Sequence, residues 1–202
     1  MHISEGILSA PVLITGACLS AVGVGIGLKK LDSDQIPQAG LLAAAFFVAS
    51  LIHIPVGPSS AHLVLNGLLG VVLGWAAFPV ILCALFLQAM LFQFGGLTGL
   101  GVNTFVMAFP ALACMLLCRP LLRSQNKTRV AVGAFICGFS AVLMSAILAA
   151  LALVATGEQF LEAAEALIAL NSPVMLIEGF VTTFVVLFLK RVKPGILDAA
   201  YA

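Results

Sequence analysis

Charged residues are scarce in this chain. Only 8% of its 202 residues are Asp, Glu, Lys or Arg, whereas 62% are apolar. A soluble domain carries about 25% charged residues, so this composition cannot cover a water-facing surface. The apolar runs are continuous and lack the alternation of a membrane β-barrel. We therefore predict an all-α integral membrane protein, and the net charge of +1 gives no case for nucleic-acid binding.

Several sequence motifs that indicate catalysis or ion pumping are also absent. The chain has no Walker A pattern, so we expect no ATP hydrolysis of its own. It has no row of intramembrane acids for an ion-coupled pump, and no Ser-His-Asp or metalloprotease pattern. Its five cysteines lie in apolar runs without CxxC spacing, which is typical of packing residues. A membrane-embedded enzyme would need paired acids or a nucleophile, so a binding component energised by partners is favoured.

The few cations fall into three short clusters, and Lys and Arg beside membrane spans are held on the cytoplasmic side. The clusters are Lys29–Lys30; Arg119, Arg123, Lys127 and Arg129; and Lys190, Arg191 and Lys193.

About seven apolar segments are candidates for membrane spans. Their predicted bounds are Ile7 or Pro11 to Leu28, Ala39–Ile54, His62–Trp75, Phe78–Phe94, Asn103–Cys118, Val130–Thr156 and Val174–Leu189. The basic clusters follow the first, fifth and seventh segments, which exit on one side. We therefore expect the N-terminus outside, the C-terminus in the cytoplasm, and a single domain over 1–202. No basic n-region precedes the first span, so we expect no cleaved signal peptide.

Stretches 31–38, 55–61, 95–102 and 157–173 are polar or rich in Pro and Gly, and we expect loops there. Two of them, 55–61 and 95–102, lie outside in this topology. Irregular backbone at membrane depth persists only where protein buries it or where it lines a cavity. These two loops are therefore candidates for a ligand site. Small-residue spacings such as Gly16/Ser20 and Gly23/Gly27 predict close helix crossings.

His2 could chelate a metal together with the start of the chain. The Met1 amine, the His2 amide nitrogen and the His2 Nδ1 would close a five-membered and a six-membered ring around one ion. Tetragonal nitrogen coordination favours Ni²⁺ or Cu²⁺, and a strong-field site also takes Co²⁺. The arrangement requires that Met1 be retained, which the bulky His2 favours. A solvated terminus without function is the alternative interpretation.

His53 and His62 flank the loop at 55–61, and either could supply a fourth nitrogen. Each could equally be a hydrogen-bonded packing histidine, and the residues alone do not separate these interpretations. Candidate side chains that would orient an imidazole from nearby are Ser59, Ser60, Asn66, Thr98 and Asn103.

Glu178 is the only acid inside a predicted span. It could be a buried hydrogen-bond partner for a loop or for the ligand site, or a carboxylate that reaches water at the outer leaflet. We favour the buried partner, because the adjacent Gly179 allows close approach of another helix.

Four stretches together resemble the CbiM/NikM family, the substrate-binding (S) components of cobalt and nickel energy-coupling-factor (ECF) transporters. They are Met1–Leu8, Pro55–Leu63, Phe94–Thr104 and Ile177–Thr182, and they are spread over the whole chain. The resemblance implies a seven-helix fold whose N-terminus is drawn into the bundle from outside. It implies a planar nitrogen site built from the Met1 amine, the His2 amide and ring, and His62. His53 stands where the family often has Asn, so we expect an added or second-shell ligand there.

The resemblance also implies Co²⁺ or Ni²⁺ as the transported substrate, with cobalt for cobalamin biosynthesis favoured, and no organic cofactor. The implied partners are a transmembrane coupling (T) subunit, two cytoplasmic ATPases and often a small accessory membrane protein, in a bacterial or archaeal plasma membrane. The alternative is an S component for another small ligand such as a vitamin. The Met1–His2 start argues against that alternative.

Overall fold

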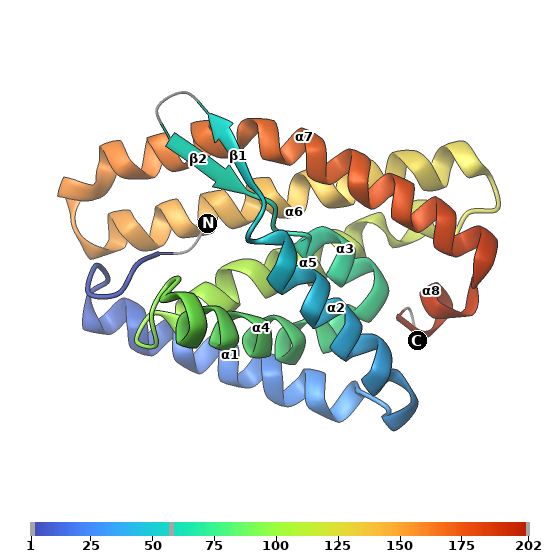
Figure 1. Ribbon diagram of the computed structural model, residues 1–202, viewed down its shortest axis with the longest axis horizontal. Helices are drawn as coiled ribbons and strands as arrows, with labels where there is room; N and C mark the ends of the chain where they lie inside the picture. Colours follow the sequence, from blue (N-terminus) through green and yellow to red (C-terminus); the bar gives the residue numbers. More distant parts are fainter. Residues whose placement is uncertain (1–2, 57–58, 201–202) are drawn as a thin grey trace.

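Helices dominate the computed structural model, which describes residues 3–56 and 59–200. The elements are α1 (Ala10–Lys30), η1 (Ser33–Gln35), α2 (Ile36–Ala49), β1 (His53–Val56), β2 (Ser59–His62), α3 (Asn66–Leu73), η2 (Gly74–Ala76), α4 (Ala77–Phe92), α5 (Leu100–Leu122), α6 (Lys127–Thr156), η3 (Glu158–Phe160), α7 (Leu161–Val192) and α8 (Gly195–Ala200). Figure 1 shows the long helices running roughly side by side, and the two-stranded hairpin contacts α7.

Within the described residues, five helical segments are long and apolar enough to cross a membrane. They are Ala10–Lys30, Asn66–Phe92, Leu100–Leu122, Lys127–Thr156 and Glu158–Val192. The predicted helical membrane architecture is confirmed, but the predicted count of seven spans is not. Helix α2 has only 14 residues and α3 only eight, and α3 continues through η2 into α4 as one apolar segment.

The loop predicted at 157–173 is wrong, because α7 runs unbroken through most of it. Pro173 lacks the N–H that would donate to the carbonyl of Ala169. The Ser172 hydroxyl donates to that carbonyl instead, at 2.8 Å, and the Asn171 amide donates to the carbonyl of Leu167 at 2.7 Å. The polar residues that suggested a loop therefore satisfy the backbone of a helix.

Other predicted boundaries also shift. Helix α5 continues past Pro120 to Leu122, and α2 already begins at Ile36 with Pro37 in its first turn, where proline is tolerated. The second and third predicted spans, which met at the loop 55–61, are both shorter. A β-hairpin and a connecting turn occupy residues 53–65 between them. Helix α8 was not predicted.

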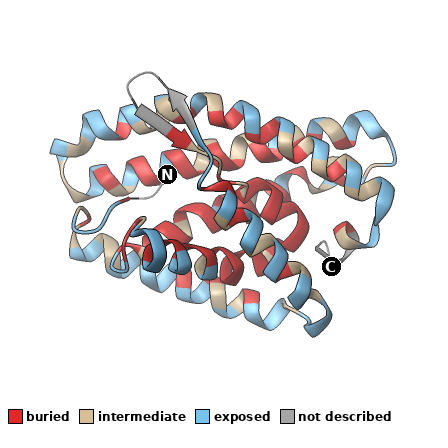
Figure 2. Cartoon of the chain, viewed as in Figure 1, coloured by how far each residue is buried: buried red, intermediate tan, exposed pale blue. Residues whose placement is uncertain are grey.

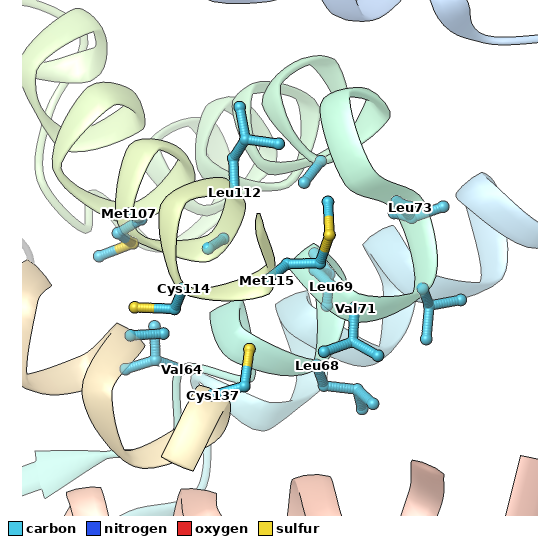
Figure 3. Packing of buried hydrophobic residues seen from close by; sticks show 14 of the residues in the cluster. Val64, Leu68, Leu69, Val71, Leu73, Met107, Leu112, Cys114, Met115 and Cys137 are labelled. Carbon is cyan, nitrogen blue, oxygen red and sulfur yellow. The ribbon is translucent and has the colours of Figure 1, made fainter. Parts of the chain in front are cut away.

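The core is centred on α3 and α4, which the other helices enclose; both are mostly red in Figure 2. All eight residues of α3 are buried. Its two glycines allow close contact, because a Cβ on Gly67 would lie 2.7 Å from Cα of Gly138, and one on Gly70 would overlap the carbonyl of Ala111. Figure 3 shows Leu68 and Leu69 packed among sulfur-containing side chains from α5 and α6, Met115 and Cys137 among them.

The three basic clusters share one end of the bundle. The C-terminal ends of α1, α5 and α7 and the start of α6 all lie at the right of Figure 1. The Lys190 ammonium on α7 donates to the carbonyls of Leu122, at 3.2 Å, and of Ser124. The connection between α6 and α7 and the loop before α5 lie at the opposite end. The three basic clusters therefore lie at one end of the bundle, as the prediction that the first, fifth and seventh segments exit on one side requires.

The predicted close crossings of α1 are confirmed. Ser20 donates to the carbonyl of Gly101 at 2.6 Å, and an added Cβ on Gly16 would lie 2.8 Å from Cα of Val102. On the same helix, Gly25 is exposed and has no atom within 4 Å of such a Cβ.

We expect Gly16→Ala to destabilise the protein by about 1–3 kcal/mol, because the new methyl group overpacks the α1–α5 crossing. The matched change Gly25→Ala should be neutral or stabilising by about 0.5–1 kcal/mol, since alanine favours a helix over glycine. Unfolding of both purified variants in detergent measures the difference. Equal stabilities would contradict the packing described for α1.

Candidate metal centre

The hairpin β1–β2 brings His53 and His62 together. The two residues pair across the antiparallel strands, with Ile54 opposite Ala61 as the next pair. Directly opposed residues project from the same face of a sheet. The two ring centroids lie 6.2 Å apart, with the rings edge to face at 69°. The loop prediction missed this hairpin, and with it the reason that two histidines nine positions apart become neighbours.

Each imidazole is oriented by a nearby backbone carbonyl. Nδ1 of His62 lies 2.8 Å from the carbonyl oxygen of Leu63, and Nδ1 of His53 lies 3.0 Å from that of Leu51. Because a carbonyl oxygen only accepts, each Nδ1 carries the proton, and the lone pair of each neutral ring is on Nε2. Both histidines are thus held in the tautomer that binds a metal through Nε2.

The two histidines differ in exposure. His53 is exposed, whereas His62 is half-buried. Burial lowers the pKa of His62 to about 3, and the nearby His53 adds a smaller lowering. His62 is therefore neutral at physiological pH, and a neutral imidazole is the form that binds metals.

Aromatic side chains connect the hairpin to the neighbouring helices. The His53 ring lies 6.4 Å from the ring of Phe94, which is 5.8 Å from that of Phe92. Phe92 in turn lies 5.6 Å from Phe47 on α2. Edge-to-face and tilted pairs at such distances are favourable aromatic contacts. The exposed histidine is thus fixed from one side by a row of rings.

The N-terminal segment folds back along the loop that precedes α5. Asn103 holds the backbone of Ile3 at both groups: its Oδ1 accepts from the Ile3 amide at 3.0 Å, and its Nδ2 donates to the Ile3 carbonyl at 3.1 Å. Ile3 is only 3% exposed and packs against Val102 and Val106. One amide side chain therefore fixes the position from which the first two residues extend.

Further contacts hold residues 5 to 9. The Glu5 carboxylate accepts from the Thr98 amide at 3.4 Å, and the Ser9 amide donates to the Thr156 hydroxyl at 3.2 Å. Gly96, at φ +69°, is needed here, because a Cβ would meet Glu5 at 2.5 Å. Met1 and His2, the predicted chelating residues, lie outside the described residues.

Glu178 reaches from α7 to the turn that follows His62. Its Oε1 accepts from the amides of Val64, at 2.5 Å, and Leu65, at 2.7 Å. Leu65 has a left-handed backbone, φ 55°, which costs energy in any residue with a side chain. The carboxyl group is fully buried, so it does not reach water at the outer leaflet. In the described part of the chain, its Oε2 has no hydrogen-bond partner.

Asn66 contacts neighbouring helices rather than an imidazole. The Asn66 amide donates to the Met107 carbonyl at 3.1 Å and to the Ser145 hydroxyl at 2.9 Å, and so fixes the start of α3. The side chains of Ser59 and Ser60 lie outside the described part. Among described residues, no group of three His, Cys, Asp or Glu side chains is arranged to hold a metal.

Five long apolar helical segments in the described part of the chain define a multi-pass helical membrane protein. Residues 2–196 match the family described as the cobalt uptake substrate-specific transmembrane region, and the chain belongs to this family. By this membership it is a membrane transport component and not an enzyme.

Individual relatives agree with the family assignment. A Haemophilus influenzae protein named "Putative metal transport protein" is 39% identical, covering 98% of this chain and 97% of its own length. The fused nickel transport protein NikMN of Rhodobacter capsulatus is 38% identical over 54% of this chain and 33% of its own length. A crystal structure of a transition metal transporter superposes with a TM-score of 0.76 at 28% identity, covering 95% of this chain and 93% of the other.

We expect Glu178→Ala to loosen the turn between β2 and α3, because two buried amides lose their acceptor, at about 1–3 kcal/mol each. Glu178→Gln keeps an acceptor oxygen and should have a smaller effect. Hydrogen exchange at Val64 and Leu65 measures the loosening directly. Glu162→Gln, an exposed acid on the same helix, is the control. Unchanged exchange in the alanine variant would show that Glu178 does not hold this turn.

Proposed function

We propose that this protein is the substrate-binding component of an energy-coupling-factor importer that captures Co²⁺ or Ni²⁺ outside the cell. The observation that carries the proposal is that both elements bearing the predicted ligands are held in place by the fold. Asn103 fixes the backbone of Ile3, directly after the predicted chelating residues, and the hairpin presents a half-buried neutral imidazole at His62. Family membership supports the same cargo.

The proposed ligands are the Met1 amine, the amide and ring nitrogens of His2, and Nε2 of His62. Four nitrogens in a plane suit Ni²⁺, and Co²⁺ under a strong ligand field. His62 is favoured over His53 because it is half-buried, and a dry, shaped surrounding strengthens metal binding. The proposal requires that Met1 be the first residue of the mature chain, which intact mass measurement determines.

His53 is proposed as an additional ligand above the plane or as an entry ligand. The two rings are neighbours across the hairpin, with their centroids 6.2 Å apart. Its exposure would let His53 meet the ion first. The segments that carry the proposed ligands are held in place by hydrogen bonds of Thr98, Asn103, Asn66 and Glu178.

The transport step is proposed to depend on partners: a membrane coupling subunit, two cytoplasmic ATPases and, in some systems, a small accessory membrane protein. A putative fused cobalt transport protein CbiMQ of Methanocorpusculum labreanum supports such partners, because 97% of this chain matches only 36% of that protein's length. ATP hydrolysis by the partners would reorient the component and release the ion inside. Cobalt is favoured as the cargo by the family description. The same description argues against a vitamin as the ligand.

We expect one Gly added before Met1 to abolish metal binding, because the terminal amine would no longer close the five-membered chelate ring. The protein with its native start should hold near one Ni²⁺ or Co²⁺ per chain, with a visible absorption band. The control is the same Gly added after Ala202. His62→Ala should lose binding as well, whereas His53→Ala should weaken it by about 10–100-fold at most. Equal metal content in the native and extended proteins would sink the amine chelate and move the site to the two histidines.

The proposed orientation has the N-terminus outside and all three basic clusters in the cytoplasm, with residues 1–202 acting as one transmembrane metal-binding domain. A fluorescent protein fused after Ala202 should therefore fluoresce, and alkaline phosphatase at the same position should be inactive, since each is active on one side only. The N-terminus must stay unmodified for metal binding. A reporter inserted in the connection between α6 and α7 should therefore serve as the opposite-side control. Phosphatase activity at the C-terminus would invert the topology.

A further inference from the structure

A large cavity lies at the basic end of the bundle, away from the histidines. Its volume is about 1150 Å³, and it is bounded by the end of α5, the start of α6, the last turns of α7 and the start of α8. These segments meet at the right of Figure 1, whereas the connection between α6 and α7 lies at the left. The cavity is therefore distinct from the candidate metal centre.

The polar part of its wall is positively charged. Four basic side chains line the cavity: Arg123, Lys127, Lys190 and Arg191. Among the described residues that line it, none is acidic. Lys190 is half-buried, and the carbonyls of Leu122 and Ser124 fix its ammonium group. A cationic group held in place in this way disfavours a divalent cation and favours an anion.

The remaining part of the wall is apolar and continues onto the outer surface of α7. Phe184 and Phe188 line the cavity and are 74% and 54% exposed. Phe180, one turn earlier on the same helix, is 67% exposed. These three rings form an apolar strip that begins at the basic wall and runs along the face of α7. A free inorganic anion has no apolar part that could contact this strip.

We propose that this cavity binds an anionic phospholipid. The phosphate lies against Arg123, Lys127 and Arg191, and an acyl chain follows Phe188, Phe184 and Phe180 along α7. Arg and Lys form charge-assisted hydrogen bonds with phosphate oxygens, and basic pockets between membrane helices recognise anionic head groups. The tendency of Lys and Arg to stay on the cytoplasmic side explains cations at this end of the bundle. It does not require that four of them line one cavity that opens onto an apolar surface. Lys29 and Lys30, at the same end of the bundle, are not among the lining residues.

The test compares lipids with identical acyl chains on the full chain in neutral detergent. Phosphatidylglycerol should raise the unfolding temperature and remain bound in native mass spectra, whereas phosphatidylcholine should do so weakly, because ligands that bind the folded state stabilise it. The double variant R123Q/K127Q should weaken the apparent affinity for phosphatidylglycerol by about tenfold or more. K29Q/K30Q removes the same charge at the same end of the bundle and should bind as the unaltered protein does.

Three outcomes would overturn the proposal. Equal stabilisation by phosphatidylglycerol and phosphatidylcholine would show that head-group charge is not recognised. Equal weakening of phosphatidylglycerol binding in both double variants would show that binding depends on the total charge at this end and not on the cavity. Equal stabilisation by inorganic phosphate would make the cavity a simple anion site without a role for the α7 strip. None of these results depends on metal binding, so the proposed transport function can fail or stand separately.

Discussion

A single constraint organises this molecule: in an apolar solvent, every backbone group that leaves a helix must find its partner inside the protein. The chain leaves helical geometry mainly at its N-terminal segment, at the hairpin with its following turn, and at the loop before α5. Buried side chains satisfy the first two of these departures. Asn103 pairs with both backbone groups of Ile3, and Glu178 accepts from the amides of Val64 and Leu65. The polar residues that satisfy the hydrogen-bonding groups of this irregular backbone are those that surround the candidate metal centre.

These contacts also connect the parts of the site to different helices. The segment after His62 is tied to α7, whereas Ile3 is tied to α5. The row of rings from His53 to Phe47 leads to α4 and α2. A relative movement of α7 against α5 would therefore separate the histidine from the N-terminal segment. That linkage provides a physical route by which a tilt imposed on the helices could open the site.

The sequence predicts the long helices well, because uninterrupted apolar runs ending at Lys29–Lys30 or Lys190–Arg191 have few alternatives in a membrane. It fails where short-range signals compete with tertiary contacts. Pro173 and its polar neighbours indicate a loop, yet Ser172 and Asn171 repair the helix locally. The strands at 53–56 and 59–62 show no alternation of polar and apolar residues. Their pairing depends instead on the contacts that hold each end of the hairpin. The hairpin thus lies beyond what periodicity alone can predict.

The candidate site divides in the same way. Histidine, asparagine and glutamate in an oily chain point to the residues that matter, because such groups are costly there and rarely incidental. Which atoms they contact depends on distant elements: Asn66 was considered a support for an imidazole but instead bonds to α5 and α6. The residue types alone do not separate His53 from His62, and the family resemblance favours His62; the difference in their exposure is a quantity that the sequence does not carry.

Helix α3 also bears on how the protein enters the membrane. Its eight residues rise about 12 Å, less than half of a hydrocarbon core of about 30 Å, and all eight are buried by neighbouring helices. It therefore has no face for lipid and cannot persist as an independent span. Helices α5 and α6, which enclose it, are synthesised later, so α3 reaches its final position only after they have inserted. The hairpin with His53 and His62 directly precedes α3, so its position also depends on these later helices.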